Sequence, residues 1–209
     1  ATGAATALDG QDTPAYFIDF EAVQFAVPIW KGTRPYQQIP FQFSLHRVEA
    51  DGSLQHSDFL DLSGNDPREG FVQAMIEQCG SSGPIHVYSA AFENTRIKEL
   101  ALEFPEHTDQ LLALLPRIVD LLPIARNHYY HPDQRGSWSI KALLPAICPE
   151  PSYEDLEEVQ HGMAAVDAYV EAIDPKTTSE RKFQLRDQLL KYCELDTLAT
   201  VKIWKYFRG

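Results

Sequence analysis

Apolar stretches predict several β-strands in the first half of the chain. Residues 15–23, AYFIDFEAV, are mostly aromatic, β-branched or small apolar residues, which are typical of a strand. Residues 38–62, QIPFQFSLHRVEADGSLQHSDFLDL, alternate in polarity around the turn sequence ADGS, and this pattern predicts a hairpin of two further strands. The short run PIHVYS, residues 84–89, predicts another buried strand.

Helical periodicity dominates the rest of the chain. In residues 65–80, Asp66 is placed to cap a helix that has Pro67 at its first position and ends at Gly80. Strands followed by alternating helix and strand, and then by helices, predict an α/β domain with a mixed sheet. Further helices are predicted over residues 93–104, 109–122 (broken or kinked near Pro116), 155–173 and 178–207.

The length of 209 residues suits one domain with a full core. Residues 1–14 are mainly small and polar, which predicts a linker or a vector-derived remnant, and residues 15–209 form the expected domain. Because the chain does not begin with Met, we expect it to be part of a longer protein with an additional domain. It contains no run of 18 apolar residues, so no membrane span is expected.

Cysteine content and charge narrow the expected environment and partners. Three cysteines without CxxC spacing argue against a zinc site or a disulfide framework, and favour the reducing cytoplasm. The formal charge of -12 argues against binding nucleic acid by overall electrostatic attraction. A local site, where metal ions offset the acids, is compatible with this charge.

Two carboxylates interrupt the first predicted strand. Asp19 and Glu21 are two residues apart, so a strand would direct both to the same face. Two buried carboxylates so close together repel, and a divalent cation with its preference for oxygen ligands removes that repulsion. The alternative is a strand end where both acids reach water or pair with Arg or Lys.

The last predicted helix contains a third acid in an unexpected position. Asp196 falls on the apolar stripe that runs from Leu185 to Tyr206, and Tyr192 lies one turn earlier on the same face. An acid on a face that packs against the core needs a partner. A structural salt bridge is one possibility, whereas a metal shared with Asp19 and Glu21 explains all three acids at once.

A further acid is expected from the middle of the chain. Glu93 follows the strand PIHVYS and opens a helix, where the helix dipole favours a negative group, although many first-turn acids have no other role. Ligands of open α/β sheets gather at the carboxyl ends of strands, which is where this turn falls. Asp120 in the apolar run RIVDLL is a second candidate, or a buried structural acid.

These motifs together resemble those of the DEDD 3'–5' exonucleases of the DnaQ-like superfamily. FIDFE is similar to their first motif and VYSAAFENTRI to their second, while YCELD is similar to the third motif of the tyrosine (DEDDy) branch. The resemblance spans positions 19 to 196 and implies a ribonuclease H-like fold, with a mixed sheet of about five strands flanked by helices. Glu93 departs from the pattern, because the family has Asp at this position.

The resemblance implies hydrolysis of phosphodiester bonds in DNA or RNA from a 3' end. It implies two Mg²⁺ or Mn²⁺ ions about 4 Å apart, with Asp19 bridging both. Glu21 and Asp196 would complete the metal shell, Glu93 would support one ion, and Tyr192 would orient the attacking water. Alternative hypotheses are a non-catalytic nucleic-acid-binding module and a phosphodiesterase acting on small nucleotides.

Two other segments are candidates for a part in this function. In the histidine branch of the family a His stands five residues before the Asp, whereas His161 and Asp167 are six apart and fall on opposite faces of a helix. The segment RNHYYHPDQRGSWSIK combines cations with aromatic rings, which is typical of single-stranded nucleic acid binding; the alternative is a Tyr-rich segment that folds onto its own core. The candidates for contact with single-stranded or end-frayed nucleic acid are Arg126, Tyr129, Arg135, Trp138 and Lys141.

Overall fold

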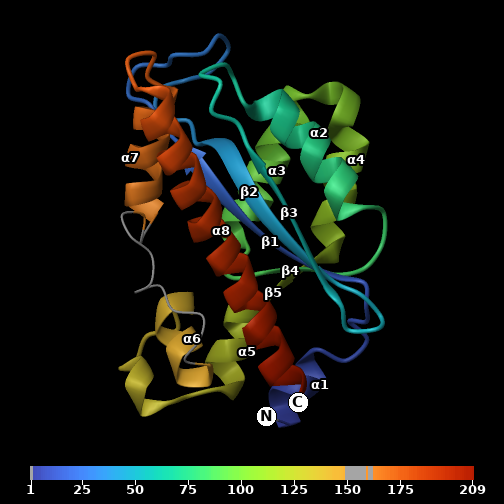
Figure 1. Cartoon of the computed structure of the whole chain (residues 1–209). Helices are drawn as coiled ribbons and strands as arrows, with labels where there is room; N and C mark the ends of the chain where they lie inside the picture. The colour runs from blue at the N-terminus through green and yellow to red at the C-terminus, as the bar shows by residue number, and fades with distance from the viewer. Residues whose placement is uncertain (1, 149–158, 160–161) are drawn as a thin grey trace.

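The computed structural model describes residues 2–148, 159 and 162–209 (Figure 1). A five-stranded sheet is formed by β1 (Ala15–Val23), β2 (Ile39–Val48), β3 (Leu54–Leu60), β4 (Ile85–Val87) and β5 (Ile118–Asp120). The helices are α1 (Thr2–Ala7), α2 (Arg68–Cys79), α3 (Ala91–Glu103), α4 (Thr108–Leu114), α5 (Leu121–His128), α6 (Ile140–Ile147), α7 (Gly162–Ile173) and α8 (Ser179–Arg208). Short 3₁₀ turns cover Pro105–His107, Leu115–Arg117 and Pro132–Gln134.

The sheet is mixed and has the strand order β3-β2-β1-β4-β5. β1, β2 and β3 pair antiparallel, as the sequence around the ADGS turn predicts, while β4 pairs parallel to β1 and β5 parallel to β4. The prediction of an α/β domain with a mixed sheet of about five strands flanked by helices is therefore confirmed. The strand order is consistent with ribonuclease H-like topology.

The two faces of the sheet are covered by different helices. Tyr16, Ile18 and Phe20 of β1 pack into a core with α2, α3 and α4. On the opposite face, Phe17 joins a core with α1, α5 and α8, and Val23 joins one with α7 and α8. Because side chains alternate along a strand, Asp19 and Glu21 also lie on the face that α8 crosses (Figure 1).

The helix predicted over residues 109–122 is broken near Pro116, as expected, but the prediction is wrong for residues 118–120, which form β5. The helix α4 ends at Leu114, a 3₁₀ turn contains Pro116, and β5 then forms the edge of the sheet beside β4. Pro116 has no backbone N–H to continue a helix, and the β-branched residues Ile118 and Val119 suit a strand. The following helix α5 ends at His128 and so includes the first three residues of the segment RNHYYHPDQRGSWSIK.

The N-terminal segment has more structure than its composition indicates. Residues 1–14 are expected to be a linker, yet α1 lies within them, and the side chains of Ala4 and Leu8 are buried in the core around Phe17. Figure 1 shows α1 beside the end of α8, and Arg208 of α8 donates a hydrogen bond to the carbonyl of Gln11 at 3.0 Å. This segment therefore packs on the domain.

Part of the helix predicted over residues 155–173 lies outside the described residues, and so does His161. The described part is α7, in which Asp167 is exposed. None of the helices in the described part of the chain combines the length and the apolar character needed to span a bilayer.

Candidate metal centre

Three carboxylates from two elements meet beneath α8. Asp19 and Glu21 project from β1 on the face that α8 covers, and Asp196 projects from α8 with only 7% of its surface exposed. One carboxylate oxygen from each of the three lies within 4.8 Å of the other two. The structure thus brings together Asp19 and Asp196, which are 177 positions apart in the sequence.

Burial and mutual repulsion favour the protonated form of the two acids on β1. Burial is the largest cause that raises the pKa of Asp19 well above its ordinary value, followed by the charge of Asp196 and then by the two glutamates. The pKa of Glu21 is raised to about 8 by burial first and by Asp196 next. A bound cation would have the opposite effect and favour the ionised acids.

Glu93 stands close to this group without belonging to its innermost part. It lies in the first turn of α3, is 3% exposed and lines the same cavity as the three carboxylates. Its Oε2 atom is buried without a hydrogen-bond partner among the described residues. Burial raises the pKa of Glu93 to about 7. An unsatisfied buried carboxylate oxygen beside an acidic cluster is suited to a ligand that brings positive charge.

Tyr192 and Lys141 complete the inner wall of the site. Tyr192 precedes Asp196 by one turn of α8 and is 4% exposed, and burial together with the charge of Asp196 raises the pKa of its hydroxyl. The ammonium of Lys141, on α6, lies 3.5 Å from the Tyr192 hydroxyl and 5.0 Å from the centre of its ring. Lys141 lowers the pKa of both Asp19 and Glu21, which makes it an internal counter-ion of the cluster.

The acids open into a cavity of about 280 Å³. A neighbouring cavity of about 610 Å³ shares three wall residues with it and extends past Arg126 and Trp138. The shared residues are Tyr88, Ser89 and Ile140. Phe92 also lines the first cavity. No pattern in the sequence predicts that these residues line a site. Together the two cavities form a path that leads away from the acids.

Asp120 is not a member of the acidic cluster. Its Oδ1 atom accepts the backbone N–H groups of Ser89 and Leu122 at 2.9 Å each, and Oδ2 accepts that of Ala90 at 2.9 Å. Asp120 thereby caps α5 and holds the turn between β4 and α3, where Ser89 has a left-handed φ of 75°. Of the two interpretations that the sequence leaves open, these hydrogen bonds support a structural acid, although Asp120 is half-buried and not fully buried.

The predicted nucleic-acid-binding segment is divided between exposed and packed residues. Arg126 and Arg135 are exposed. Tyr129 donates its hydroxyl to the carbonyl of Ala146 at 3.0 Å, and the indole N–H of Trp138 donates to the carbonyl of Tyr129 at 3.0 Å. The aromatic residues therefore hold the segment to its own core, and Lys141 is the candidate that lies inside the acidic cavity.

The donor set of the cluster fits a hard divalent cation. All of its ligand atoms are carboxylate oxygens, which Mg²⁺ and Mn²⁺ prefer, and no thiol or imidazole is among them. The pKa of Glu21 is raised and one oxygen of Glu93 has no hydrogen-bond partner among the described residues. Both features are expected of a cation site when no cation is bound. Asp19, Glu21 and Asp196 are the residues that would hold such an ion, with Glu93 beside them.

The fold and the site define an α/β domain of ribonuclease H-like topology with a carboxylate cluster between its central strand and α8. The family model described as "Domain of unknown function (DUF2779)" matches residues 16–139, more than half of the chain, and the chain belongs to this family. The match includes Asp19, Glu21 and Glu93 and ends before Lys141, Tyr192 and Asp196. No curated protein and no solved structure matches the chain.

Proposed function

We propose that this domain hydrolyses phosphodiester bonds of nucleic acid in a reaction that depends on divalent metal ions. The observation that carries the proposal is the convergence of Asp19, Glu21 and Asp196 within 4.8 Å in a buried, solvent-connected site. Structural acids are normally paired with Arg or Lys, or satisfied by backbone N–H groups, as Asp120 is. Three clustered carboxylates beside Lys141 repel one another when they are ionised, and a bound cation would balance that charge.

Each residue of the cluster has a definite part in this reaction. Mg²⁺ or Mn²⁺, when bound, would supply charge neutralisation for the scissile phosphate and a more acidic water. Asp19, Glu21 and Asp196 hold the metal site, and Glu93 places a fourth carboxylate where it can orient a water at its edge. Tyr192 keeps its proton, because burial and then the charge of Asp196 raise its pKa, and it therefore acts by donating a hydrogen bond and not as a base.

Lys141 contributes the second positive group of the site. Its ammonium lies 3.5 Å from the Tyr192 hydroxyl and lines the same cavity as the acids, within reach of a phosphate that enters that cavity. The adjoining cavity with Arg126 and Ser137 supports a chain of more than one nucleotide as the substrate. Action from the 3' end, with release of nucleoside monophosphates, rests on the resemblance to the DEDDy exonucleases.

The proposal is tested with oligonucleotides that carry a label at the 5' end. We expect single-stranded DNA or RNA to shorten stepwise from its 3' end in Mg²⁺ or Mn²⁺, and to remain intact in chelator. Asp19→Asn should lower the rate by roughly 10³-fold or more, because it removes a charged metal ligand while keeping the size of the side chain. Asp167→Asn is the matched control, since Asp167 is an exposed acid on α7.

Three outcomes would contradict the proposal. Retention of the oligonucleotide without shortening in any metal favours the non-catalytic binding module. Cleavage of dinucleotides with no action on longer chains favours the small-nucleotide phosphodiesterase. Loss of activity in Asp167→Asn but not in Asp19→Asn would place the chemistry away from the carboxylate cluster.

A further inference from the structure

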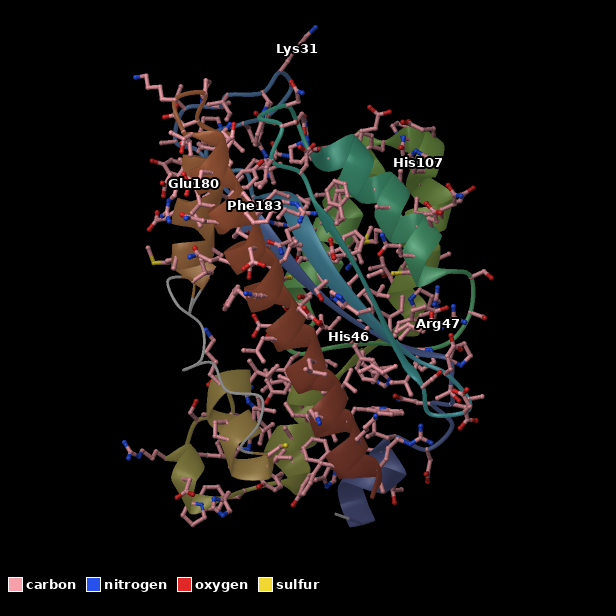
Figure 2. The ribbon with its side chains drawn as sticks, in the orientation of Figure 1. Lys31, His46, Arg47, His107, Glu180 and Phe183 are labelled. Carbon is pink, nitrogen blue, oxygen red and sulfur yellow. The ribbon has the colours of Figure 1, made fainter. Side chains whose placement is uncertain are left out.

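A second group of metal-ligating side chains lies on the same face of the sheet, toward its β3 edge. His46 on β2 and His56 on β3 are direct partners in the strand register, and Glu194 projects from α8 above them. One ligand atom from each of these three residues lies within 4.8 Å of the others. Glu194 precedes Asp196 by two residues, which is more than half a turn around the helix, so the two acids serve opposite flanks of α8. Figure 2 shows His46 next to α8.

A continuous chain of hydrogen bonds links the two histidines beneath α8. His46 Nδ1 lies 2.8 Å from the Thr197 hydroxyl, and that hydroxyl lies 2.7 Å from the Ser44 hydroxyl. The Ser44 hydroxyl lies 2.9 Å from His56 Nε2. Thr197 also bonds the carbonyl of Glu194 at 3.0 Å, which uses the one proton of its hydroxyl.

With the Thr197 hydroxyl donating to the backbone, one placement of protons satisfies every hydrogen bond of this chain. Because Thr197 donates to the backbone, its oxygen accepts from both His46 Nδ1 and Ser44. Ser44 has then used its proton, so it accepts from His56 Nε2. The lone pairs remain on His46 Nε2 and on His56 Nδ1. His56 Nδ1 in turn faces the Glu194 carboxylate at 3.8 Å, where two acceptors meet without a proton between them.

We propose that His46, His56 and Glu194 form a binding site for a Zn²⁺-type transition metal ion, separate from the carboxylate cluster. Two imidazole nitrogens and one carboxylate oxygen are a common set of three protein ligands for Zn²⁺, with a fourth position left for water. A metal-ligating histidine normally bonds a protein group through its other ring nitrogen, and Thr197 and Ser44 do this for the two rings. The ion takes the place between His56 and Glu194 that otherwise lacks a donor.

The two sites differ in the ion that each prefers. The nitrogen-containing set suits Zn²⁺, Co²⁺ or Ni²⁺, whereas the oxygen-only set of Asp19, Glu21 and Asp196 suits Mg²⁺ or Mn²⁺. His46 is buried, and burial lowers its pKa to about 4, so the ring is neutral and able to ligate at neutral pH. His56, on the edge strand, and Glu194 remain accessible from solvent and provide the entry path.

The test is to titrate the untagged chain with Zn²⁺ in excess Mg²⁺. Calorimetry measures the binding, and thermal unfolding measures the stabilisation. Every sample carries Cys148→Ser, because Cys148 is the cysteine that is not fully buried and its thiol would compete for zinc. His56→Gln and Glu194→Gln each remove one solvent-accessible ligand and leave the buried His46 in place. The matched controls are His107→Gln and Glu180→Gln, which lie away from the site in Figure 2.

We expect the parent protein and both controls to bind one Zn²⁺ and to unfold at a higher temperature when it is present. Each ligand variant should bind Zn²⁺ at least about tenfold more weakly and lose that stabilisation. Equal Zn²⁺ affinity in the parent and in both ligand variants, or no binding by the folded parent, would overturn the proposal. Neither result depends on nuclease activity, so the outcome is independent of the proposed function.

Discussion

Under the proposed function, Asp196 serves the metal site at the expense of stability. It occupies an apolar stripe of α8, and its charge is the largest electrostatic influence on Asp19 and Glu21 after burial. A carboxylate that raises the pKa of two buried neighbours destabilises the fold wherever all three are ionised. The metal-free domain therefore stores repulsion that a bound ion would relieve, as is common at functional sites.

Changing Asp196 to Asn should thus have opposite effects on stability and activity. In chelator at about pH 8, where the acids repel most, we expect Asp196→Asn to raise the free energy of unfolding by roughly 1 kcal/mol or more. In Mg²⁺ the same change should lower nuclease activity by roughly 10³-fold or more. Thermal unfolding and the oligonucleotide assay measure the two effects on one preparation.

The matched control is Asp187→Asn on the same helix. Asp187 is exposed and pairs with Lys191 at 2.7 Å, and such surface pairs contribute only about 0–1 kcal/mol. It should leave both stability and activity nearly unchanged. A metal-free Asp196→Asn protein that unfolds more easily than the parent would show that Asp196 is a structural acid and contradict the stored repulsion.

At the residue scale, periodicity made the acidic cluster predictable. The two-residue spacing of Asp19 and Glu21 placed both on one face, and the helical stripe placed Asp196 toward the core. The position of Lys141 was not predictable in the same way. The sequence places Lys141 in the segment RNHYYHPDQRGSWSIK as a candidate for contact with nucleic acid, and only the packing of α6 against α8 directs its ammonium at Tyr192.

At the scale of elements, Asp120 connects β5, α5 and the turn between β4 and α3 through hydrogen bonds. It ends β5, caps α5 and accepts two N–H groups from the turn that joins β4 to α3. That turn precedes Glu93 by three residues and includes Ser89 in a left-handed conformation, which is unfavourable for a residue with a Cβ. The carboxylate of Asp120 therefore positions the backbone from which Glu93 enters the cavity.

Replacing Asp120 with Asn should weaken the fold and the site together. The amide group can accept at only one of its two ends, so at least one buried N–H loses its acceptor. We expect Asp120→Asn to lower the free energy of unfolding by about 1–3 kcal/mol in urea denaturation. Activity should fall without loss of its metal requirement, because Asp120 positions Glu93 and contacts no metal ligand directly.

Two comparisons make this prediction specific to the turn. Glu93→Gln should lower activity without lowering stability. It replaces a buried carboxyl group, whose pKa is raised by burial, with a neutral amide of similar size. Asp133→Asn, at an exposed acid, should change neither property. Equal stability of Asp120→Asn and the parent would show that the three hydrogen bonds do not hold the turn.

The limits of sequence reasoning are clearest for short elements. β5 has three residues, too few for an alternating pattern, and it follows a proline that also suits a kinked helix. Its pairing with β4 depends on contacts between distant segments. By contrast, the hairpin was predictable, and it contains an unused signal: His46 and His56 are each five residues from Asp51 of the ADGS turn, and the register centred on Asp51 pairs them.

At the scale of the whole molecule, negative charge is concentrated both on the surface and in the interior. The formal charge of -12 gives long-range repulsion of nucleic acid, whereas the cavity holds the acids beside Lys141 and near Arg126. Divalent ions would therefore have two effects, since they complete the site and also reduce repulsion between the domain and its substrate. This combination favours short-range capture of a strand end over binding along a duplex.

The stability of the whole domain should depend on pH in a direction set by the buried acids. The folded state holds protons on Glu21 and Glu93 up to pKa values of about 8 and about 7, whereas the unfolded chain releases them near their ordinary value of 4.5. Stability from these groups is therefore fully present below about pH 4.5 and is lost as pH rises toward about 8.

The buried histidines act in the opposite direction but in a lower range. Burial lowers the pKa of His46 to about 4 and that of His86 to about 3, so both lower stability only when pH falls below about 6.5. Between about pH 7 and about pH 8.5 they are neutral in both states. The acids therefore dominate this window.

In that window and in chelator, we expect the free energy of unfolding to fall by roughly 1 kcal/mol per pH unit for each proton still held. The melting temperature should fall by roughly 2–4 °C for each kcal/mol. Glu21→Gln should reduce this slope, because it removes one of the titrating groups, and saturating Mg²⁺ should reduce it further by favouring the ionised acids. A metal-free domain that becomes more stable from about pH 7 to about pH 8.5 would mean that the acids are already ionised, and the electrostatic basis for a cation site would then be lost.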